Sequence, residues 1–283
     1  MNEKINCLYC NSAQSLPFRK KADIVQCTSC GLVYLRTRPT KETMYEIYQA
    51  YANDTSHMKP PASADGAKNN GLRREYFVNE VIGFLREKNG TWLDIGCGWG
   101  ALLNYARELG FASKGIEMTR NCLDFATMQL QIPVSNSQFT DSVISPDSCS
   151  VISMVHVLEH IPNPKETLLK VFKTLIPGGY FCGIVPNIES FCSTILKDEW
   201  VWLDPTHHYV HYSPSTLKQK LEQTGFLVEK IYTAIGDYDY AEFITLAKRE
   251  FLLNNDEGIN NKINQLLEQG KGEEIRFFAR KSF

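Results

Sequence analysis

The stretch Thr-Trp-Leu-Asp-Ile-Gly-Cys-Gly-Trp-Gly, residues 91–100, decides the fold. Its short apolar run ends at three glycines in alternate positions, as expected where a buried parallel strand turns sharply into a helix. Glycine suits such a turn because a backbone without Cβ atoms can approach a ligand closely and take a positive φ at little cost. Residues 101–109 then carry their apolar side chains on one helical face. The stretch therefore predicts a β-α unit with a ligand at the end of its strand.

Two acidic residues indicate which ligand this is. Asp94 lies two residues before the first glycine, where its charge would repel the pyrophosphate of a dinucleotide and attract a cationic ligand. Glu117 follows a predicted second strand at 114–116 and could accept hydrogen bonds from both hydroxyls of a ribose. S-adenosylmethionine carries an ammonium, a sulfonium and no phosphate, so it suits both acids. The alternative, in which Asp94 caps a helix and Glu117 is a solvated surface acid, is less favoured.

Two motifs resemble those of one enzyme family. The acidic-x-Gly-x-Gly-x-Gly motif of class I S-adenosylmethionine-dependent methyltransferases stands complete here, as Asp94, Gly96, Gly98 and Gly100. Residues 156–164, His-Val-Leu-Glu-His-Ile-Pro-Asn-Pro, resemble the fourth motif of the members that act on small molecules. The Asn-Pro-Pro-Tyr tetrapeptide of amino-directed DNA methyltransferases is absent. The resemblance implies a cofactor site made of Asp94, Gly96, Cys97, Gly98, Gly100, Glu117, Gln138 and His156.

The resemblance also assigns roles around these motifs. It implies that His156 lines the cofactor pocket, while Glu159 and His160 brace the loop before the next helix. The family's adenine-binding loop usually carries an acid, but the loop at 135–139 has none. Gln138 is therefore the adenine contact that the resemblance supports least.

Predicted strands alternate with predicted helices along the chain. Strands are expected at 92–95, 114–116, 132–134, 151–155, 180–185, 227–232 and 275–280. This rhythm predicts a mostly parallel sheet with right-handed crossovers and a ligand at the carboxyl ends of its strands. The resemblance implies that the last strand inserts antiparallel between the fifth and sixth. We therefore expect an α/β fold: a doubly wound, mostly parallel seven-stranded sheet with one antiparallel strand, plus a small N-terminal zinc-ribbon-like module.

The chain is expected to have three parts. Residues 1–39 would form the zinc-binding module, 40–70 a helix followed by a linker or lid, and 71–283 the methyltransferase domain. Within this domain, 189–212 would roof the active site and 241–270 would be a helical insertion. The predicted helix after residue 40 has a stripe of Met44, Ile47, Tyr48 and Tyr51, which we interpret as a packing surface.

Four cysteines form a pattern typical of a metal site. Cys7, Cys10, Cys27 and Cys30 make two Cys-x2-Cys pairs separated by sixteen residues. Four thiolates suit tetrahedral zinc, and so short a segment has too little apolar core to fold firmly without a staple. Because protein would fill all four positions, the zinc should be structural. Two disulfides or a redox pair are the alternative, which a reducing cytosol disfavours.

The predicted roof is rich in aromatic and titratable groups. By resemblance, His208 lies just before a helix start in the segment that covers the active site, and it is the predicted general base. His207 and His211 are the alternatives, and Asp204 is the predicted orienting partner. Simple helix initiation by Ser213 and Pro214 would explain this edge of the roof but not three histidines. Beyond the roof, Tyr238, Tyr240 and Phe243 would either extend a substrate wall or pack the insertion.

Composition bounds the partners of the 283-residue chain. The apolar share of 43% supports a substantial core, while a net charge of −2 gives no overall field that would attract nucleic acid or anionic lipid. The basic residues of the first forty positions are interpreted as a solvated face. The sequence has no apolar run of eighteen residues and no secretion signal, so a cytoplasmic protein without a membrane segment is expected. It does not predict the oligomeric state.

These observations predict methyl transfer to a small molecule. The zinc module resembles the amino-terminal module of bacterial sugar methyltransferases, whose C-methylating members usually carry a further carboxy-terminal domain that this chain is too short to hold. We therefore expect O-methylation of a sugar-like or natural-product metabolite. An rRNA or tRNA methyltransferase that holds RNA with its zinc module, and a non-catalytic cofactor-binding protein, remain as alternatives.

Overall fold

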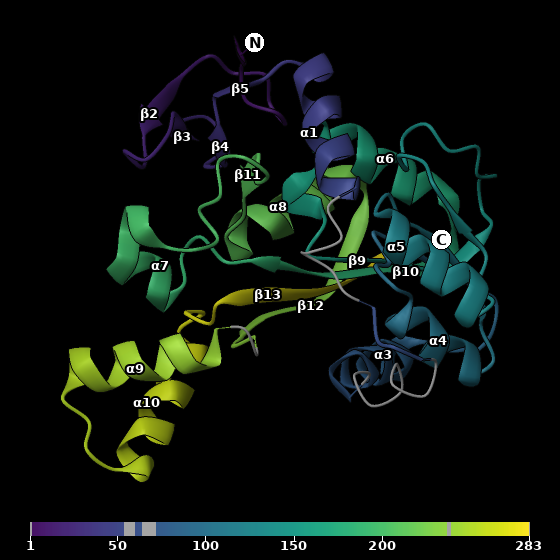
Figure 1. Cartoon of the computed structure of the whole chain (residues 1–283). Helices are drawn as coiled ribbons and strands as arrows, with labels where there is room; N and C mark the ends of the chain where they lie inside the picture. The colour runs from purple at the N-terminus through teal and green to yellow at the C-terminus, as the bar shows by residue number, and fades with distance from the viewer. Residues whose placement is uncertain (1, 54–59, 64–71, 237–238, 283) are drawn as a thin grey trace.

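One large sheet organises the molecule (Figure 1). The computed structural model describes residues 2–53, 60–63, 72–236 and 239–282. Seven strands form the sheet in the order β12 (Phe226–Ala234), β13 (Glu274–Lys281), β10 (Leu175–Pro186), β9 (Cys149–Val155), β6 (Thr91–Ile95), β7 (Ala112–Ile116) and β8 (Val134–Ser135). Only β13 runs antiparallel to its two neighbours. The predicted fold, including the place of its antiparallel strand, is confirmed.

Helices cover both faces of this sheet because its strands are apolar on both sides. On one face α3 (Leu72–Phe84) packs beside α4 (Ala101–Glu108), and on the other α6 (Pro164–Thr174) packs beside α8 (Pro214–Thr224) (Figure 1). Trp92 and Leu93, neighbours on β6, belong to the two different cores. The remaining short helices are α5 (Arg120–Asp124), η1 (Phe125–Gln129), η2 (Leu158–His160), α7 (Phe191–Leu196) and η3 (Lys197–Glu199).

The N-terminal module shares a sheet with the predicted roof. Strands β2 (Ser15–Pro17), β3 (Ile24–Cys27) and β4 (Val33–Leu35) continue into β11 (Val210–His211), which pairs antiparallel with β4. A separate pair, β1 (Asn2–Lys4) and β5 (Thr37–Pro39), leads into α1 (Lys41–Asn53), where Met44 is buried as predicted. The apolar residues of the module belong to the same core as those of the roof. The module therefore packs onto the large domain instead of standing apart from it.

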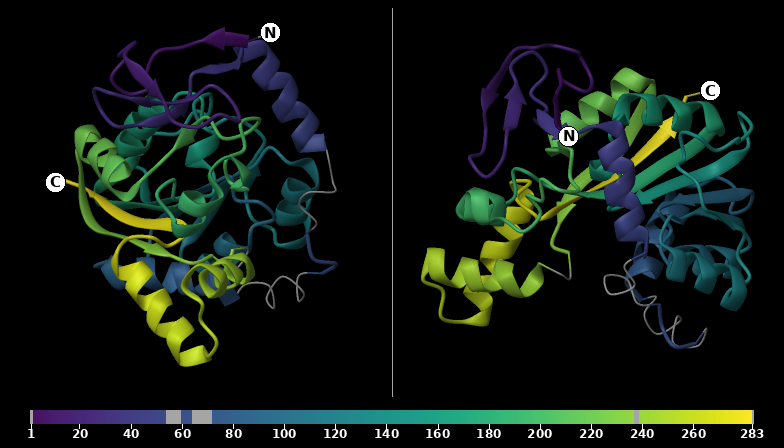
Figure 2. Two further views of the ribbon diagram at one scale, coloured as in Figure 1. Left: turned by 90° about the vertical axis from the view of Figure 1, so that its left-hand side faces the viewer. Right: turned by 45° about the horizontal axis from the view of Figure 1, so that its top comes forward.

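The expected helical insertion consists of two helices. α9 (Tyr240–Phe251) and α10 (Asp256–Glu268) project together from one edge of the molecule (Figure 2). Leu252 ends α9 with φ 53°, and Asn255 caps α10 by accepting a hydrogen bond from the Gly258 amide. Phe243 is buried against Phe191 at 5.3 Å between ring centroids, so it packs the insertion. Tyr240 is exposed, and Tyr238, like most of the predicted linker, lies outside the described residues.

A buried carboxylate anchors the start of the roof to the sheet. Glu273 accepts hydrogen bonds from the Ser190 hydroxyl at 2.8 Å, the Cys192 amide at 3.0 Å and the Trp200 indole at 3.3 Å. Burial raises the pKa of Glu273 from 4.5 to about 6, against the effect of these hydrogen bonds. The charged form is therefore less favoured in the folded chain than in the unfolded one.

This raised pKa predicts a pH-dependent stability. A carboxyl whose pKa rises on folding contributes stability below its unfolded pKa and loses it as the pH rises through its folded pKa. We expect the free energy of unfolding of the wild type to fall, relative to Glu273→Gln, by about 2 kcal/mol as the pH rises from about 4 to 7. Urea unfolding of both proteins across this range measures the difference. Parallel curves would contradict the raised pKa.

None of the helices in the described ranges is both long and apolar enough to cross a membrane.

Candidate active site

The glycine loop after β6 has the backbone that its sequence predicts. Gly96, Gly98 and Gly100 have φ of 70°, 53° and 89°, in a backbone region that residues other than glycine rarely adopt. A Cβ at Gly96 would also lie 2.4 Å from Cγ2 of Val157, in the segment after β9. Helix α4 begins at the next residue, Ala101. The amides of Gly96 and Cys97 donate to the carbonyl of Ile116, so the loop is held against the end of β7. It lies at the carboxyl end of the sheet, where α/β folds of this type bind ligands.

The two predicted acids are buried at the ends of adjacent strands. Asp94 accepts a 2.6 Å hydrogen bond from the Ser153 hydroxyl, which in turn accepts one from the indole of Trp92. Glu117 accepts 2.7 Å hydrogen bonds from the amides of Gly98 and Thr119. It therefore links the end of β7 to the glycine loop. Ser153 was not predicted, because its role depends on strand β9 lying next to β6.

These acids also fix the state of the thiol between the glycines. Burial, followed by the charges of Asp94 and Glu117, raises the pKa of Cys97 well above its usual value. The thiol is therefore neutral and can contribute to ligand binding only through its backbone and its shape. Two buried carboxylates beside a neutral thiol form a site that suits a ligand with positive charge.

The other two predicted cofactor residues lie in the next loops. Gln138 accepts backbone hydrogen bonds from Asp141 and Ser142, so it turns the loop after β8, and the Asn136 amide ties this loop to the carbonyl of Glu117. His156 follows β9 with φ 54° and stacks on Trp202 with ring centroids 5.4 Å apart. The fold thus brings the predicted cofactor residues to one edge of the sheet.

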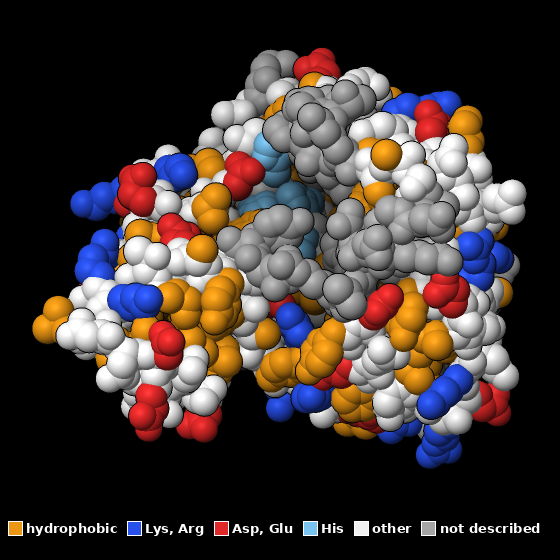
Figure 3. Space-filling model, turned by 60° about the horizontal axis from the view of Figure 1, so that its bottom comes forward, with side chains coloured by type: hydrophobic (Ala, Val, Ile, Leu, Met, Phe, Trp, Pro, Cys, Tyr) orange, Lys and Arg blue, Asp and Glu red, His pale blue; other side chains and the backbone are white. Residues whose placement is uncertain are grey.

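All five histidines among the described residues lie near this edge of the sheet. Figure 3 shows histidine side chains in a hollow of the molecular surface. Ring centroids of His160 and His208 are 4.6 Å apart, and those of His208 and His211 are 6.3 Å apart. Trp202 stacks on His208 at 6.2 Å as well as on His156. Trp202 therefore joins the predicted cofactor end of the cluster to the roof.

The ring of His208 is held by a backbone carbonyl. Its Nδ1 lies 2.7 Å from the carbonyl oxygen of Trp202, which can only accept, so Nδ1 carries a hydrogen and the neutral ring has its lone pair on Nε2. Asp204 instead pairs with Nδ1 of His207 at 2.6 Å. The prediction that Asp204 orients His208 is therefore wrong, because the turn between them points the carboxylate at the nearer histidine.

The other predicted base candidate, His211, lies inside the protein. It sits on β11, and burial lowers its pKa to about 3. Burial likewise lowers the pKa of His160 to about 4, and the Nδ1 of this ring lies 3.0 Å from the carbonyl oxygen of His207. Both rings are therefore neutral near pH 7. Next to them, Glu159 is buried, and its backbone carbonyl accepts a 2.9 Å hydrogen bond from the Tyr209 amide of the roof.

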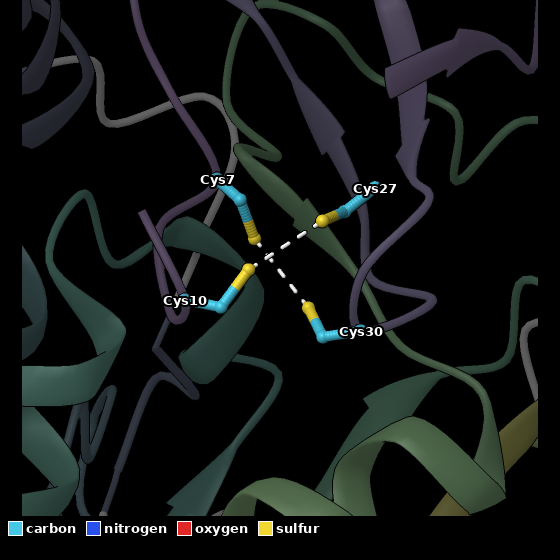
Figure 4. Close-up of side chains that lie close together, drawn as sticks. All are labelled: Cys7, Cys10, Cys27 and Cys30. Carbon is cyan, nitrogen blue, oxygen red and sulfur yellow. Dashed lines mark hydrogen bonds between the residues drawn. The ribbon is translucent and has the colours of Figure 1, made fainter. Parts of the chain in front are cut away.

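The four cysteines of the module converge on one point (Figure 4). Sγ of Cys7 lies 3.5 Å from Sγ of Cys30, and the same distance separates Cys10 from Cys27. Sulfurs bound tetrahedrally to one zinc ion at about 2.3 Å would lie about 3.8 Å apart, so the four thiols fit such an ion. Burial raises the pKa of Cys27, but backbone N–H groups of Ser29 and Cys30 outweigh it and lower the pKa to about 7. None of the four forms a disulfide.

The module contacts the roof directly. Besides the pairing of β4 with β11, the Leu35 amide donates to the carbonyl of Tyr209, and the hydroxyls of Tyr9 and Tyr212 lie 2.9 Å apart in the core. His208 is the residue before Tyr209, so these contacts hold the backbone of the predicted base. A two-residue strand has no periodicity that could have revealed this pairing in the sequence.

Comparison with known proteins agrees with this architecture. Residues 72–231 match a family model described as a methyltransferase domain. A ubiquinone biosynthesis O-methyltransferase of Coxiella burnetii is 28% identical over 226 residues, which cover 76% of this chain and 89% of that protein. The corresponding protein of Aliivibrio fischeri is also 28% identical, over 55% of this chain and 70% of its own length.

Solved structures share the fold. An S-adenosylmethionine-dependent methyltransferase from Archaeoglobus fulgidus aligns with a TM-score of 0.54 and 22% identity over 75% of this chain and 94% of that one. Geranyl diphosphate C-methyltransferase from Streptomyces coelicolor aligns with a TM-score of 0.55 and 12% identity over 86% of this chain and all of that one. The chain belongs to the methyltransferase-domain family and is an S-adenosylmethionine-dependent methyltransferase.

Proposed function

We propose that this enzyme transfers a methyl group to a hydroxyl oxygen of a small molecule, of a sugar-like or other natural-product class. The observation that carries the proposal is the His208 ring, fixed so that Nε2 has a lone pair, beside the His156 end of the cofactor edge. A hydroxyl acceptor must lose a proton, and a neutral imidazole suits that task near neutral pH. O-methylation is also the reaction named for the relatives in Coxiella and Aliivibrio.

The chain's own residues would divide the work as follows. Asp94 and Glu117 would bind the cationic and ribose parts of the cofactor, and the glycine loop, which has no Cβ atoms at its three glycines, would let the cofactor approach the backbone closely. Bound S-adenosylmethionine supplies an electrophilic methyl group. His208 would accept the acceptor's proton at Nε2, with His207 and His211 as the alternatives. The roof would align the acceptor and exclude water, which is the larger part of catalysis for an in-line displacement.

We further propose that Cys7, Cys10, Cys27 and Cys30 bind one structural zinc ion, and that the module is of the kind found in bacterial sugar methyltransferases. The spacing of the sulfurs and the absence of disulfides among them support the ion. Its task would be to hold the strands that carry the roof.

An RNA substrate is less supported, because the three arginine side chains of the module already have partners. Arg36 pairs with Asp23 at 2.7 Å, and Arg38 donates to the carbonyl of Pro162 at 2.7 Å. Arg19 donates to Ser193 in α7. Guanidinium groups used inside the protein are poor phosphate contacts, and the net charge of −2 adds no long-range attraction.

Mass spectrometry tests the proposed function. The enzyme is incubated with deuteromethyl-labelled S-adenosylmethionine and a pool of cell metabolites, and products are searched for the label on oxygen. A labelled small-molecule ether is the expected result. Cofactor binding without labelling of any metabolite pool would favour the non-catalytic alternative, and label in RNA alone would favour the RNA alternative.

Glu117 gives a prediction for cofactor affinity. Replacing it by Ala removes charge-assisted hydrogen bonds to the ribose, worth about 1.5 to 3 kcal/mol, and also the two that hold the glycine loop. We expect affinity for S-adenosylmethionine to fall roughly tenfold to a hundredfold by calorimetry. Glu117→Gln, which keeps the side-chain shape and one acceptor oxygen, should lose less. Unchanged affinity in the Ala variant would contradict the ribose assignment.

A further inference from the structure

The proposed methyl transfer leaves one buried carboxylate unexplained. Glu159, in η2, is 1% exposed, and neither of its carboxylate oxygens has a hydrogen-bond partner among the described residues. The ring of His156 comes nearest as an ion-pair partner, with Nδ1 3.6 Å from Oε1, which is too long for a hydrogen bond. Taking a carboxylate out of water without a partner costs several kcal/mol. The site therefore calls for a cation.

Two histidines offer further ligand atoms at the same place. A ring nitrogen of His160, a ring nitrogen of His208 and an oxygen of Glu159 all lie within 4.8 Å of one another. In both rings Nδ1 donates to a backbone carbonyl, of His207 and of Trp202 respectively, which puts the lone pair of the neutral ring on Nε2. Metal-binding histidines are typically oriented in this way, by a hydrogen bond from the nitrogen that does not bind the ion.

We propose that Glu159, His160 and His208 bind a divalent transition-metal ion, at a site separate from the four cysteines. Two imidazoles and one carboxylate suit manganese, iron, cobalt or zinc better than magnesium or calcium, which prefer oxygen ligands alone. Ligand atoms at about 2.1 Å from one ion lie at most about 4.2 Å apart, so the three side chains need to move only slightly to close on it.

The ion would join two segments that the fold already holds together. Glu159 and His160 come from the loop after β9, and His208 comes from the roof. The hydrogen bond from the Tyr209 amide to the carbonyl of Glu159 fixes the backbones of both segments at the site. Three protein ligands leave coordination positions open, and these could take an oxygen of the acceptor and favour its ionised form. With the ion on Nε2 of His208, that ring could not also accept the acceptor's proton, so the ion would take over the task assigned above to the free base. That last consequence rests on the proposed function, whereas the metal site itself does not.

Binding of Mn²⁺ to the full chain tests the site, because Mn²⁺ prefers nitrogen and oxygen ligands to thiolates. The protein is first loaded with zinc at the cysteines and freed of weakly bound ions, and no cofactor or acceptor is added. Loss of the electron paramagnetic resonance signal of free Mn²⁺ then counts bound ions. We expect one per wild-type chain, and binding weaker by roughly a hundredfold or more in Glu159→Gln and His208→Gln. His207→Gln is the matched control, because that ring pairs with Asp204, and it should bind like the wild type.

Thermal unfolding gives a second readout that also checks folding. Mn²⁺ should raise the melting temperature of the wild type and not that of Glu159→Gln. Without Mn²⁺, Glu159→Gln should still unfold in one cooperative transition, since Gln keeps the size of the side chain and the backbone hydrogen bond between residue 159 and Tyr209. A wild type that binds no Mn²⁺, or a Glu159→Gln variant that binds it equally well, would overturn the site. Either result would leave the proposed methyl transfer standing, because neither measurement involves cofactor or acceptor.

Discussion

Replacing His208 by Gln is expected to lower the single-turnover rate of methylation by about 10² to 10⁴ while affinity for S-adenosylmethionine stays near that of the wild type. The loss follows from removing the lone pair on Nε2, the group proposed to take the acceptor's proton. Cofactor affinity should hold because Asp94 and Glu117 lie at the strand ends of β6 and β7, where they accept hydrogen bonds from Ser153 and from the amides of Gly98 and Thr119. Rapid-quench methylation with the native acceptor measures the rate, and calorimetry measures the affinity.

The neighbouring histidines provide matched controls. His207 is paired with Asp204 and partly exposed, so His207→Gln should change the rate by less than about tenfold. His211 is buried on β11, where Nε2 has no hydrogen-bond partner within the described part of the chain, so His211→Gln should act mainly on stability. If His208→Gln keeps most of the wild-type rate, His208 is not the base, and catalysis rests on alignment alone or on a neighbour. A parallel fall of rate, cofactor affinity and stability in His208→Gln would show a structural histidine.

The cofactor edge was predictable because its signal is local. Asp94 and the three glycines lie in one turn, and three glycines at alternate positions predict the positive φ values that the structure shows. Glu117 was found for a similar reason, since in a parallel sheet the ends of successive strands meet at one edge. The antiparallel place of β13 came from the family resemblance and could not be read from a run of eight apolar and charged residues.

The roof was harder to predict because its contacts join distant segments. Nothing in residues 209–211 shows that they extend a sheet begun at residue 33, and nothing near Glu159 shows that its carboxylate faces a histidine some fifty positions later. Backbone partners leave no mark in the sequence either, so the sequence does not reveal that the Trp202 carbonyl orients His208 and points to Asp204 instead. The helical insertion expected at 241–270 is divided into two helices, because Leu252 ends the first helix and Asn255 caps the second.

The second large effect is expected from the zinc module, because its strand β4 pairs with β11 of the roof. Cys27→Ser should lose the zinc ion, and β4 then no longer fixes β11 and the backbone next to His208. Turnover should fall by about a hundredfold, because a displacement of a catalytic group by about 1 Å costs about that much in rate. Affinity for S-adenosylmethionine should change little, since the glycine loop and Glu117 hold each other without the module. Elemental analysis in reducing buffer, single-turnover rates and calorimetry measure the three quantities.

Two further variants separate the ion from the contacts it supports. Cys149→Ser changes a buried cysteine of β9 outside the module and should keep one zinc per chain. Tyr9→Phe keeps all four thiols but removes the 2.9 Å hydrogen bond to Tyr212, so it should retain zinc and show a smaller loss of turnover than Cys27→Ser. A wild type without zinc, or a Cys27→Ser protein with full zinc, would exclude the four-cysteine site. An effect on the roof alone would leave the cofactor site at Asp94 and Glu117 intact, and cofactor affinity would then hold. If cofactor affinity in Cys27→Ser instead falls as far as turnover, the module supports the whole domain and not only the roof.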